Sequence, residues 1–194
     1  ELNVPGEHNI LNSLAAVVLG LEMGLSFEKI RDGIYSYNGV RRRFDIKGIY
    51  NDVIIVDDYA HHPTEVEATL KSAKSGWDRR IIAVFQPHLF SRTREFFKEF
   101  ADVLQIANIV IITDIYPARE KPIQGVTSKL IYDELENKNH NCYLVPDIDD
   151  LAGTLDQVTQ PGDMLITMGA GNIWRYNESY VKHIQSLTNG VENC

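Results

Sequence analysis

The chain has 194 residues, of which 44% are apolar and 24% are charged, so it can form a globular domain and is too apolar for a disordered chain. Its formal net charge of −8 argues against nucleic acid as the main partner, because phosphate binding needs a basic surface. No apolar run is long enough to cross a bilayer, and the 2 cysteines lack metal-ligand or disulfide-framework spacing, so we expect a reduced, cytoplasmic protein with no membrane partner.

The first part of the chain is predicted to be helical. Apolar residues fall at helical spacing over residues 8–24, and a shorter helix is expected over 27–36. The chain begins without Met and enters a helix almost at once, so we expect it to be a piece of a longer protein. Residues 1–38 would then close another domain, and the basic segment 39–47 would be the linker to the next one.

From residue 45 onward, strand-like and helical patterns alternate. This alternation predicts an α/β fold, with a Rossmann-like, mostly parallel sheet that has helices on both faces and follows a short helical segment. Only Asn51 and Asp52 separate the first two strands, which predicts an antiparallel hairpin at one edge. Strands are expected at 45–50, 53–57, 81–85, 109–113, 142–145 and 164–168, and helices at 64–75, 93–106, 127–137, 148–158 and 173–186.

A dense polar turn, Asp57-Asp58-Tyr59-Ala60-His61-His62-Pro63-Thr64-Glu65, follows the second strand. Ligands of open α/β sheets bind at the carboxyl ends of strands, so Asp58 could bind ribose hydroxyls or could be an ordinary turn acid. Adjacent histidines on a regular element point in different directions, which disfavours a zinc site shared by His61 and His62. Thr64 and Glu67 are predicted to form a capping box at the start of the next helix.

A second polar cluster, Gln86-Pro87-His88-Leu89-Phe90-Ser91-Arg92-Thr93-Arg94, follows the third strand. Cations near a helix start oppose its dipole unless an anion binds there, and we favour anion binding for Arg92 more than for Arg94. The alternative is a solvated pair that bridges to Glu95 or Asp102. Two adjacent strand ends with such residues predict the rim of one active site.

Three weaker signals remain open. One arginine of Arg41-Arg42-Arg43 could reach phosphates between domains, while at least one is expected to be a solvated linker residue. Asn9 and Asn12 share a helix face and could pair with an adenine edge. The Gly-rich turn 168–172 could equally cradle an anion or be a tight structural turn.

Taken together, these residues resemble the Mur ligases across nearly the whole chain. The resemblance is strongest to the members that join L-alanine to UDP-N-acetylmuramate in peptidoglycan precursor synthesis. The matching strings, in family order, are Pro5–Asn12, Gly39–Phe44, Asp57–Glu65, Phe85–His88 with Ser91–Arg94, Tyr116–Ala118 and Met168–Gly171. The resemblance implies that residues 48–194 are the carboxy-terminal, amino-acid-binding domain of an ATP-dependent ligase that works through an acyl phosphate.

The resemblance also implies that the UDP-binding domain and the P-loop, with the Mg²⁺ ligands, lie outside this chain. The chain alone is then expected to be inactive, and it is expected to hold no metal. The implied nucleotide-binding residues are His8, Asn9, Asn12, Arg43 and Asp58, with Arg43 on the ATP phosphates and Asp58 on the ribose.

By the same resemblance, Tyr59, His61 and Arg92 surround the incoming alanine, with Arg92 on its carboxylate, and His88 and Arg94 are weaker members of that group. Arg43 and His61 are the implied catalytic residues. Many Mur ligases carry a further arginine where this chain has Leu89, which leaves open how the alanine carboxylate is held.

Two other functions compete with this interpretation. One is a metal-dependent phosphoesterase that uses Asp57, Asp58, His61, His62 and His88, although the sequence offers few further ligands. The other is a non-catalytic nucleotide or amino-acid binding module.

Overall fold

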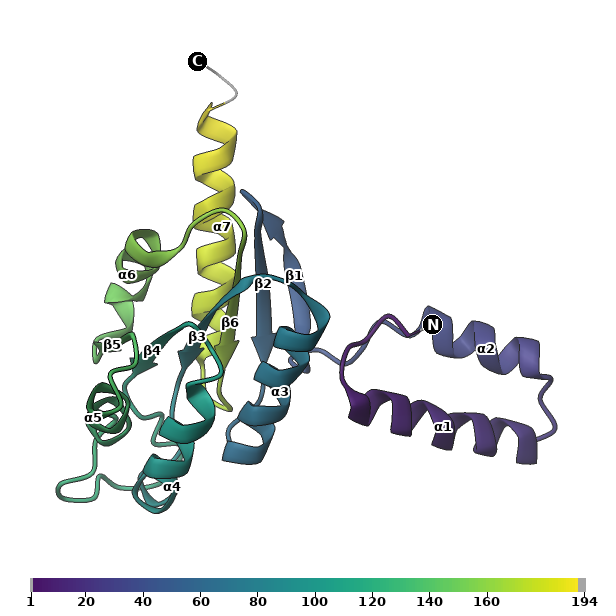
Figure 1. Ribbon diagram of the computed structural model, residues 1–194, viewed down its shortest axis with the longest axis horizontal. Coiled ribbons are helices and arrows are strands. Elements are labelled where there is room, and N and C mark those ends of the chain that lie inside the picture. The colour runs from purple at the N-terminus through teal and green to yellow at the C-terminus, as the bar shows by residue number, and fades with distance from the viewer. Residues whose placement is uncertain (1, 192–194) are drawn as a thin grey trace.

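The computed structural model describes residues 2–191, without the side chains of residues 7, 8 and 187–191. Two helices, α1 (Glu7–Glu22) and α2 (Phe27–Ser36), form a hairpin that projects to one side of a larger α/β body (Figure 1). Gly20 lets the two helices approach closely, because a Cβ there would lie 2.8 Å from Cγ1 of Ile30. No helix in the described part of the chain is long and apolar enough to span a membrane.

The body is built on a sheet of six strands in the order β1-β2-β6-β3-β4-β5. All neighbouring pairs are parallel except β1 and β2, which confirms the predicted mixed sheet. The antiparallel pair turns at Asn51 and Asp52, whose φ angles of 49° and 58° are those of a tight hairpin. The strands are β1 (Asp45–Tyr50), β2 (Val53–Asp58), β3 (Arg80–Phe85), β4 (Ile109–Thr113), β5 (Cys142–Val145) and β6 (Asp163–Met168).

Helices cover both faces of the sheet. Three of them, α3 (Pro63–Gly76), α4 (Phe90–Leu104) and α5 (Lys129–Asn137), pack on the face that includes Val56. On the opposite face lie α6 (Leu151–Val158), which follows a short 3₁₀ turn (Ile148–Asp150), and α7 (Ile173–Val191), against Ile55. Alternate residues of β2 thus face opposite helix layers, which explains why this strand is apolar on both faces.

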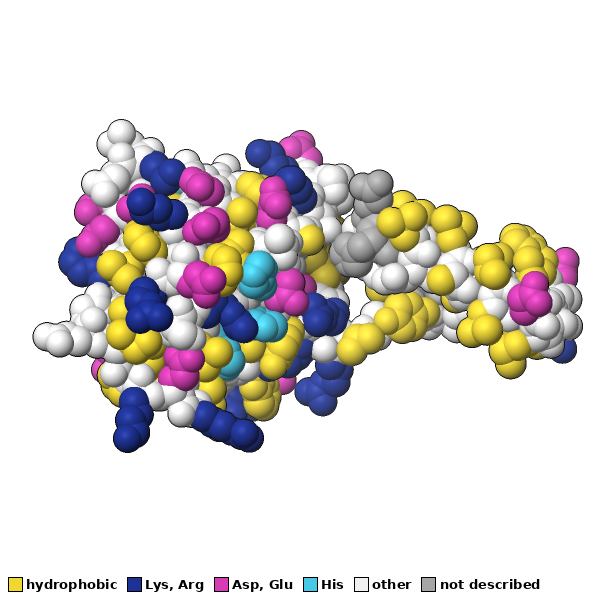
Figure 2. Space-filling view, turned by 90° about the horizontal axis from the view of Figure 1, so that it is seen from below, with side chains coloured by type: hydrophobic (Ala, Val, Ile, Leu, Met, Phe, Trp, Pro, Cys, Tyr) yellow, Lys and Arg dark blue, Asp and Glu magenta, His cyan; other side chains and the backbone are white. Residues whose placement is uncertain are grey.

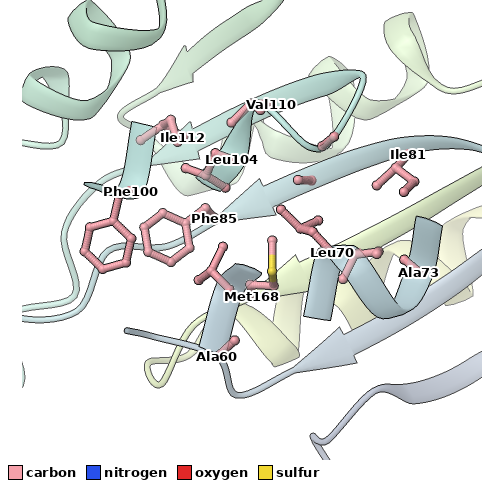
Figure 3. Packing of buried hydrophobic residues seen from close by; sticks show 14 of the residues in the cluster. Ala60, Leu70, Ala73, Ile81, Phe85, Phe100, Leu104, Val110, Ile112 and Met168 are labelled. Carbon is pink, nitrogen blue, oxygen red and sulfur yellow. The ribbon is translucent and has the colours of Figure 1, made fainter. Parts of the chain in front are cut away.

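One buried layer of the core lies between the sheet and the helices that follow its strands β2 and β3. Phe85 of β3 and Phe100 of α4 are both buried, and their ring centroids lie 4.8 Å apart (Figure 3). Leu70 of α3 and Met168 of β6 complete the same layer. This packing holds α3 and α4 against the sheet from whose edge they start.

The register places the polar segments side by side. Asp58 at the end of β2 and Phe85 at the end of β3 both pair with Met168 of β6. The turn that follows β2 and the segment that follows β3 therefore flank the same point of the sheet. The rim predicted from the sequence is thus a continuous edge of the structure.

Most predicted boundaries differ from the structure by three residues or fewer. The predicted capping box at Thr64 and Glu67 is wrong, since α3 begins at Pro63 with His62 as its N-cap and Glu65 as the acid of its capping box. Proline is favoured at the first helical position, which moves the cap back to the preceding residue. Strand β1 begins at Asp45, inside the segment 39–47 predicted to be a linker.

Candidate active site

A pocket of about 440 Å³ lies between the start of α1, the linker and the first half of α3. Asn9 and Asn12 line it from α1, Arg43 from the linker, and Asp58 from the end of β2. We call it the linker pocket. Four of the five residues predicted to bind nucleotide therefore line one cavity, although they come from three separate segments. The side chain of the fifth, His8, lies outside the described part of the structure.

Asp58 anchors the linker pocket to the sheet. Its two carboxylate oxygens accept hydrogen bonds from the backbone N–H groups of Phe44 and Ala60, each at 2.7 Å. Burial raises the pKa of Asp58, and these backbone hydrogen bonds oppose that rise. A carboxylate has about four acceptor sites, so Asp58 can still accept hydroxyl hydrogens from a ligand.

Arg43 reaches the linker pocket from the left-handed turn of the linker. Its side chain is 56% exposed, and its Nη1 lies 3.8 Å from Oε1 of Glu65. Glu65 also accepts the backbone N–H groups of His61 and His62. Burial alone would raise the pKa of Glu65, but these hydrogen bonds and the charges of His61 and Arg43 together lower it. Arg43 is thus held loosely by one carboxylate and by the Tyr59 ring, whose centre lies 5.9 Å from the centre of the guanidinium, and it lines the pocket.

Beside the linker pocket, four residues form a second group, which we call the histidine cluster: Tyr59, His61, His88 and Arg92. The ring of His61 lies 5.1 Å from that of Tyr59 and 5.9 Å from that of His88, edge-on in both cases. Nη1 of Arg92 donates to the carbonyl oxygen of His61 and to Nδ1 of His88, both at 3.5 Å. Figure 2 shows histidine, arginine and acidic side chains gathered on this face of the body.

The partners of the two histidines define their tautomers. Nδ1 of His61 lies 2.9 Å from the carbonyl oxygen of Tyr59 and 3.1 Å from Oε2 of Glu65, so Nδ1 carries a hydrogen, and Nε2 is an acceptor when the ring is neutral. Burial, and then the positive charges of Arg92 and His61, lower the pKa of His88. His88 is therefore neutral at pH near 7 and can accept the hydrogen bond from Arg92.

Arg94 and His62 do not join the histidine cluster. Arg94 is exposed and lies two positions after Arg92 on α4, which turns its side chain by about 200° around the helix axis. The ring of His62 packs edge-on against Phe96 with 5.0 Å between centroids. His61 and His62 thus point in different directions, as predicted.

The backbone N–H groups of Leu89 and Ser91, at the start of α4, already have hydrogen-bond partners within the protein. Glu120 accepts hydrogen bonds from the backbone N–H of Ser91 at 2.9 Å and from its hydroxyl at 2.5 Å. Leu89 is the N-cap of α4, with a φ of 73°, and its N–H donates to the carbonyl oxygen of Tyr116. With Leu89 apolar and Ser91 bound to Glu120, Arg92 is the cation of this turn that faces the histidines.

The Gly-rich turn is structural. A Cβ on Gly171 would lie 2.8 Å from Cβ of Tyr116, and one on Gly169 would lie 2.8 Å from the carbonyl oxygen of Gln86. The side chain of Gln86 donates to Asn172 and accepts the backbone N–H of residue 173. The glycines therefore allow close packing against the segment after β3, which favours the second of the two interpretations left open for this turn.

The phosphoesterase alternative lacks a ligand set. Asp57 is paired with Arg42, and both oxygens of Asp58 accept backbone N–H groups. Within residues 2–191, apart from the side chains left undescribed, no group of three His, Cys, Asp or Glu side chains is placed to hold a metal ion. The proposed combination of Asp57, Asp58 and histidines is therefore not assembled around one point.

Residues 42–171, two-thirds of the chain, match the family described as the glutamate ligase domain of Mur ligases. The chain belongs to the Mur ligase family. It is 48% identical over 188 residues to the UDP-N-acetylmuramate–L-alanine ligase of Salinibacter ruber, covering 96% of this chain and 40% of that protein. It is 45% identical over 186 residues to the enzyme of the same name from Geotalea uraniireducens, covering 94% of this chain and 40% of that protein.

Solved Mur ligases share the fold. The crystal structure of UDP-N-acetylmuramate–alanine ligase MurC from Thermotoga maritima matches with a TM-score of 0.83 and 29% identity, over 95% of this chain and 39% of that one. MurF ligase from the same organism, in complex with ADP, matches with a TM-score of 0.67 over 93% of this chain and 39% of that one, and at 20% identity it supports the fold alone. The chain thus spans about 40% of the length of the relatives it matches.

Two residues of this candidate site were missed from the sequence. Glu65 links Arg43 to both histidines, and the pattern of a capping acid three residues after the N-cap could have identified it had His62 been recognised as the cap. Arg42 is the second, because a run of three arginines gives no sign of which one is the least exposed. The predicted division into residues 1–38, 39–47 and 48–194 stays a prediction.

Proposed function

We propose that this chain is the carboxy-terminal part of an ATP-dependent ligase that joins L-alanine to UDP-N-acetylmuramate in peptidoglycan precursor synthesis. The observation that carries the proposal is that the linker pocket and the histidine cluster adjoin: Asp58 lines the first, and its neighbour in sequence, Tyr59, belongs to the second. Two relatives named for this reaction, 48% and 45% identical, support the same choice.

The linker pocket has the size and the groups that a nucleotide needs. A volume of about 440 Å³ lies within the range of small-ligand sites. The amide of Asn9 donates to the carbonyl oxygen of Pro5 at 2.6 Å, which orients its remaining donor and acceptor, and Asn12 lies one helical turn away. In the proposal these two amides bind adenine, Asp58 accepts ribose hydroxyls, and Arg43 binds phosphate oxygens. Mg²⁺, which the family uses with ATP, would be held by residues outside this chain.

The histidine cluster suits a small zwitterion. The planar guanidinium of Arg92 can bind a carboxylate through two parallel hydrogen bonds, since its contacts to His61 and His88 are long and leave donors free. Because Nδ1 of His61 is bound to the carbonyl oxygen of Tyr59, Nε2 of the neutral ring can take a hydrogen from the alanine ammonium group. The amine that results carries the lone pair that must attack the activated carboxyl carbon.

The chemistry that follows is acyl transfer. ATP phosphorylates the muramate carboxylate with loss of ADP, and the alanine amine attacks the carbonyl carbon of the acyl phosphate. The C–O bond to phosphate then breaks with its electron pair on the phosphate, which takes the surplus proton from the nitrogen as the amide forms. This chain contributes position and charge. Arg43 neutralises phosphate oxygens at the linker, while Arg92 and His61 hold the amine in line with the carbonyl.

The proposal is tested by phosphate release from the full-length protein that contains this chain. Release should require ATP, UDP-N-acetylmuramate and L-alanine together, and mass spectrometry should detect the alanyl amide of the muramate. The chain of 194 residues alone should release none, because the family's P-loop is not within it. Release that is independent of L-alanine, or equally fast with any amino acid, would contradict the proposed substrate.

A further inference from the structure

Arg42 lies between the linker pocket and the histidine cluster, yet no step of the proposed reaction uses it. Its side chain is 22% exposed, whereas that of its neighbour Arg41 is 83% exposed and that of Arg43 is 56% exposed. An arginine that is withdrawn from water in part carries a desolvation cost, so its partners have to offset that cost. The partly buried position of Arg42 therefore calls for an explanation that a solvated linker does not give.

The contacts of Arg42 join three separate segments. Its Nε donates to Oδ2 of Asp57 at 3.2 Å and its Nη2 donates to the carbonyl oxygen of Gly169 at 2.6 Å. The centre of its guanidinium lies 4.8 Å from the centre of the Tyr59 ring. A planar, delocalised cation can make these contacts at the same time, and the point charge of a lysine cannot.

Asp57, which binds Arg42, is itself held in place by residues of β6 and α7. It is fully buried, and its Oδ1 accepts the hydroxyl of Thr167 at 2.9 Å. The same hydroxyl accepts Nδ2 of Asn177 from α7 at 2.9 Å. Burial raises the pKa of Asp57, and the Thr167 hydrogen bond and the charge of Arg42 oppose that rise. The Asp57 carboxylate thus has a fixed position in the sheet, and its hydrogen bond with Nε fixes the position of the Arg42 guanidinium in turn.

Tyr59 extends these contacts into the histidine cluster. Its ring lies 5.1 Å from that of His61, whose carbonyl oxygen in turn accepts Nη1 of Arg92. The backbone of Arg42 supports the same turn, since its carbonyl oxygen accepts the N–H of Tyr59 at 2.7 Å.

We propose that Arg42 is a positioning residue for the amino-acid site, which holds the Tyr59 ring, and through it His61, in place relative to the linker. The inference rests on the proposed function and adds to it. It separates the roles of adjacent arginines, because Arg43 binds phosphate oxygens while Arg42 sets the geometry of the pocket for L-alanine. The backbone contacts of residue 42 do not depend on its side chain, so a change of side chain leaves Arg43 on the same linker turn.

The test uses the full-length ligase with Arg42→Lys, which keeps a positive charge for Asp57 and so avoids an unpaired buried carboxylate. The KM for L-alanine should rise about tenfold, which corresponds to about 1.4 kcal/mol, while the KM for ATP changes less than about twofold. Arg41→Lys is the matched control and should leave both constants unchanged. An unchanged KM for L-alanine, or an equal rise for ATP, would overturn the inference.

A double-mutant cycle tests whether Arg42 acts through Tyr59. In a Tyr59→Leu background, Arg42→Lys should raise the KM for L-alanine by less than about threefold, because the ring that it positions is gone. Full additivity of the two substitutions would overturn the inference. A wild-type ligase that forms no alanine amide would refute the proposed function, whereas a failed cycle in an active ligase would refute only the role of Arg42.

Discussion

Replacing Arg92 by alanine should weaken the binding of L-alanine without destabilising the fold. Arg92 is the third residue of α4, where a cation opposes the positive end of the helix dipole, and its two protein contacts are long at 3.5 Å. Its removal should therefore cost little stability, and the thermal midpoint of unfolding should stay the same or rise slightly. If Arg92 binds the alanine carboxylate, the loss of charged hydrogen bonds should cost about 1.5–3 kcal/mol.

That cost corresponds to a rise of about tenfold to 150-fold in the KM for L-alanine, with a much smaller change for ATP. Steady-state phosphate release at varied L-alanine, with the other two substrates saturating, measures it. Arg94→Ala is the matched control, because Arg94 lies on the same helix but faces away. Equal effects of the two substitutions, or equal effects of Arg92→Ala on alanine and ATP, would refute the assignment of Arg92 to the alanine carboxylate.

Three further predictions follow from the packing and charges. Arg43→Ala should lower turnover and weaken ATP binding with little change in the KM for L-alanine, and an effect confined to alanine in steady-state assays would exclude a role at the phosphates. In urea unfolding, Gly171→Ala should lower the free energy of unfolding by about 1–3 kcal/mol, because the added Cβ would clash with the Tyr116 side chain. Gly153→Ala in α6 should raise the free energy of unfolding by about 0.5–1 kcal/mol, because nothing lies within 4 Å of the added Cβ and alanine favours a helix. Because the pKa of His88 is lowered in the fold, the unfolded chain binds more protons below about pH 6.5, so stability should fall as pH decreases through this window. His88→Gln should reduce that fall in thermal unfolding midpoints, and an identical pH profile would show that His88 is not responsible.

The sheet could be predicted from the sequence because strands and hairpins follow from short-range patterns of apolar and polar residues. Continuous apolar runs such as Val53–Val56 indicate strands buried on both faces, and the two polar residues between the first strands predict the hairpin. Parallel strands end at one edge, so the grouping of Asp58, His61 and Arg92 along one rim could also be anticipated.

The details at the rim depended on contacts between distant segments. Nothing in the sequence places the carbonyl oxygen of Gly169 against Arg42, or Glu120 against the start of α4, since these partners are 127 and 29 residues apart. The helix cap was misplaced because proline and the residue before it compete with Thr64 for the same role. Arg92 and Arg94 lie on different faces of α4. Which of them faces the histidines depends on where α4 begins, and the sequence did not fix that residue.

The central claim is that one edge of this sheet binds a nucleotide and an amino acid side by side. A crystal structure of the full-length ligase with a non-hydrolysable ATP analogue and L-alanine tests it most directly. The adenine should lie between α1 and α3 next to Asn9 and Asn12, and the alanine carboxylate should lie within hydrogen-bond distance of Arg92. A nucleotide bound outside the linker pocket, or alanine bound away from the histidine cluster, would contradict the account.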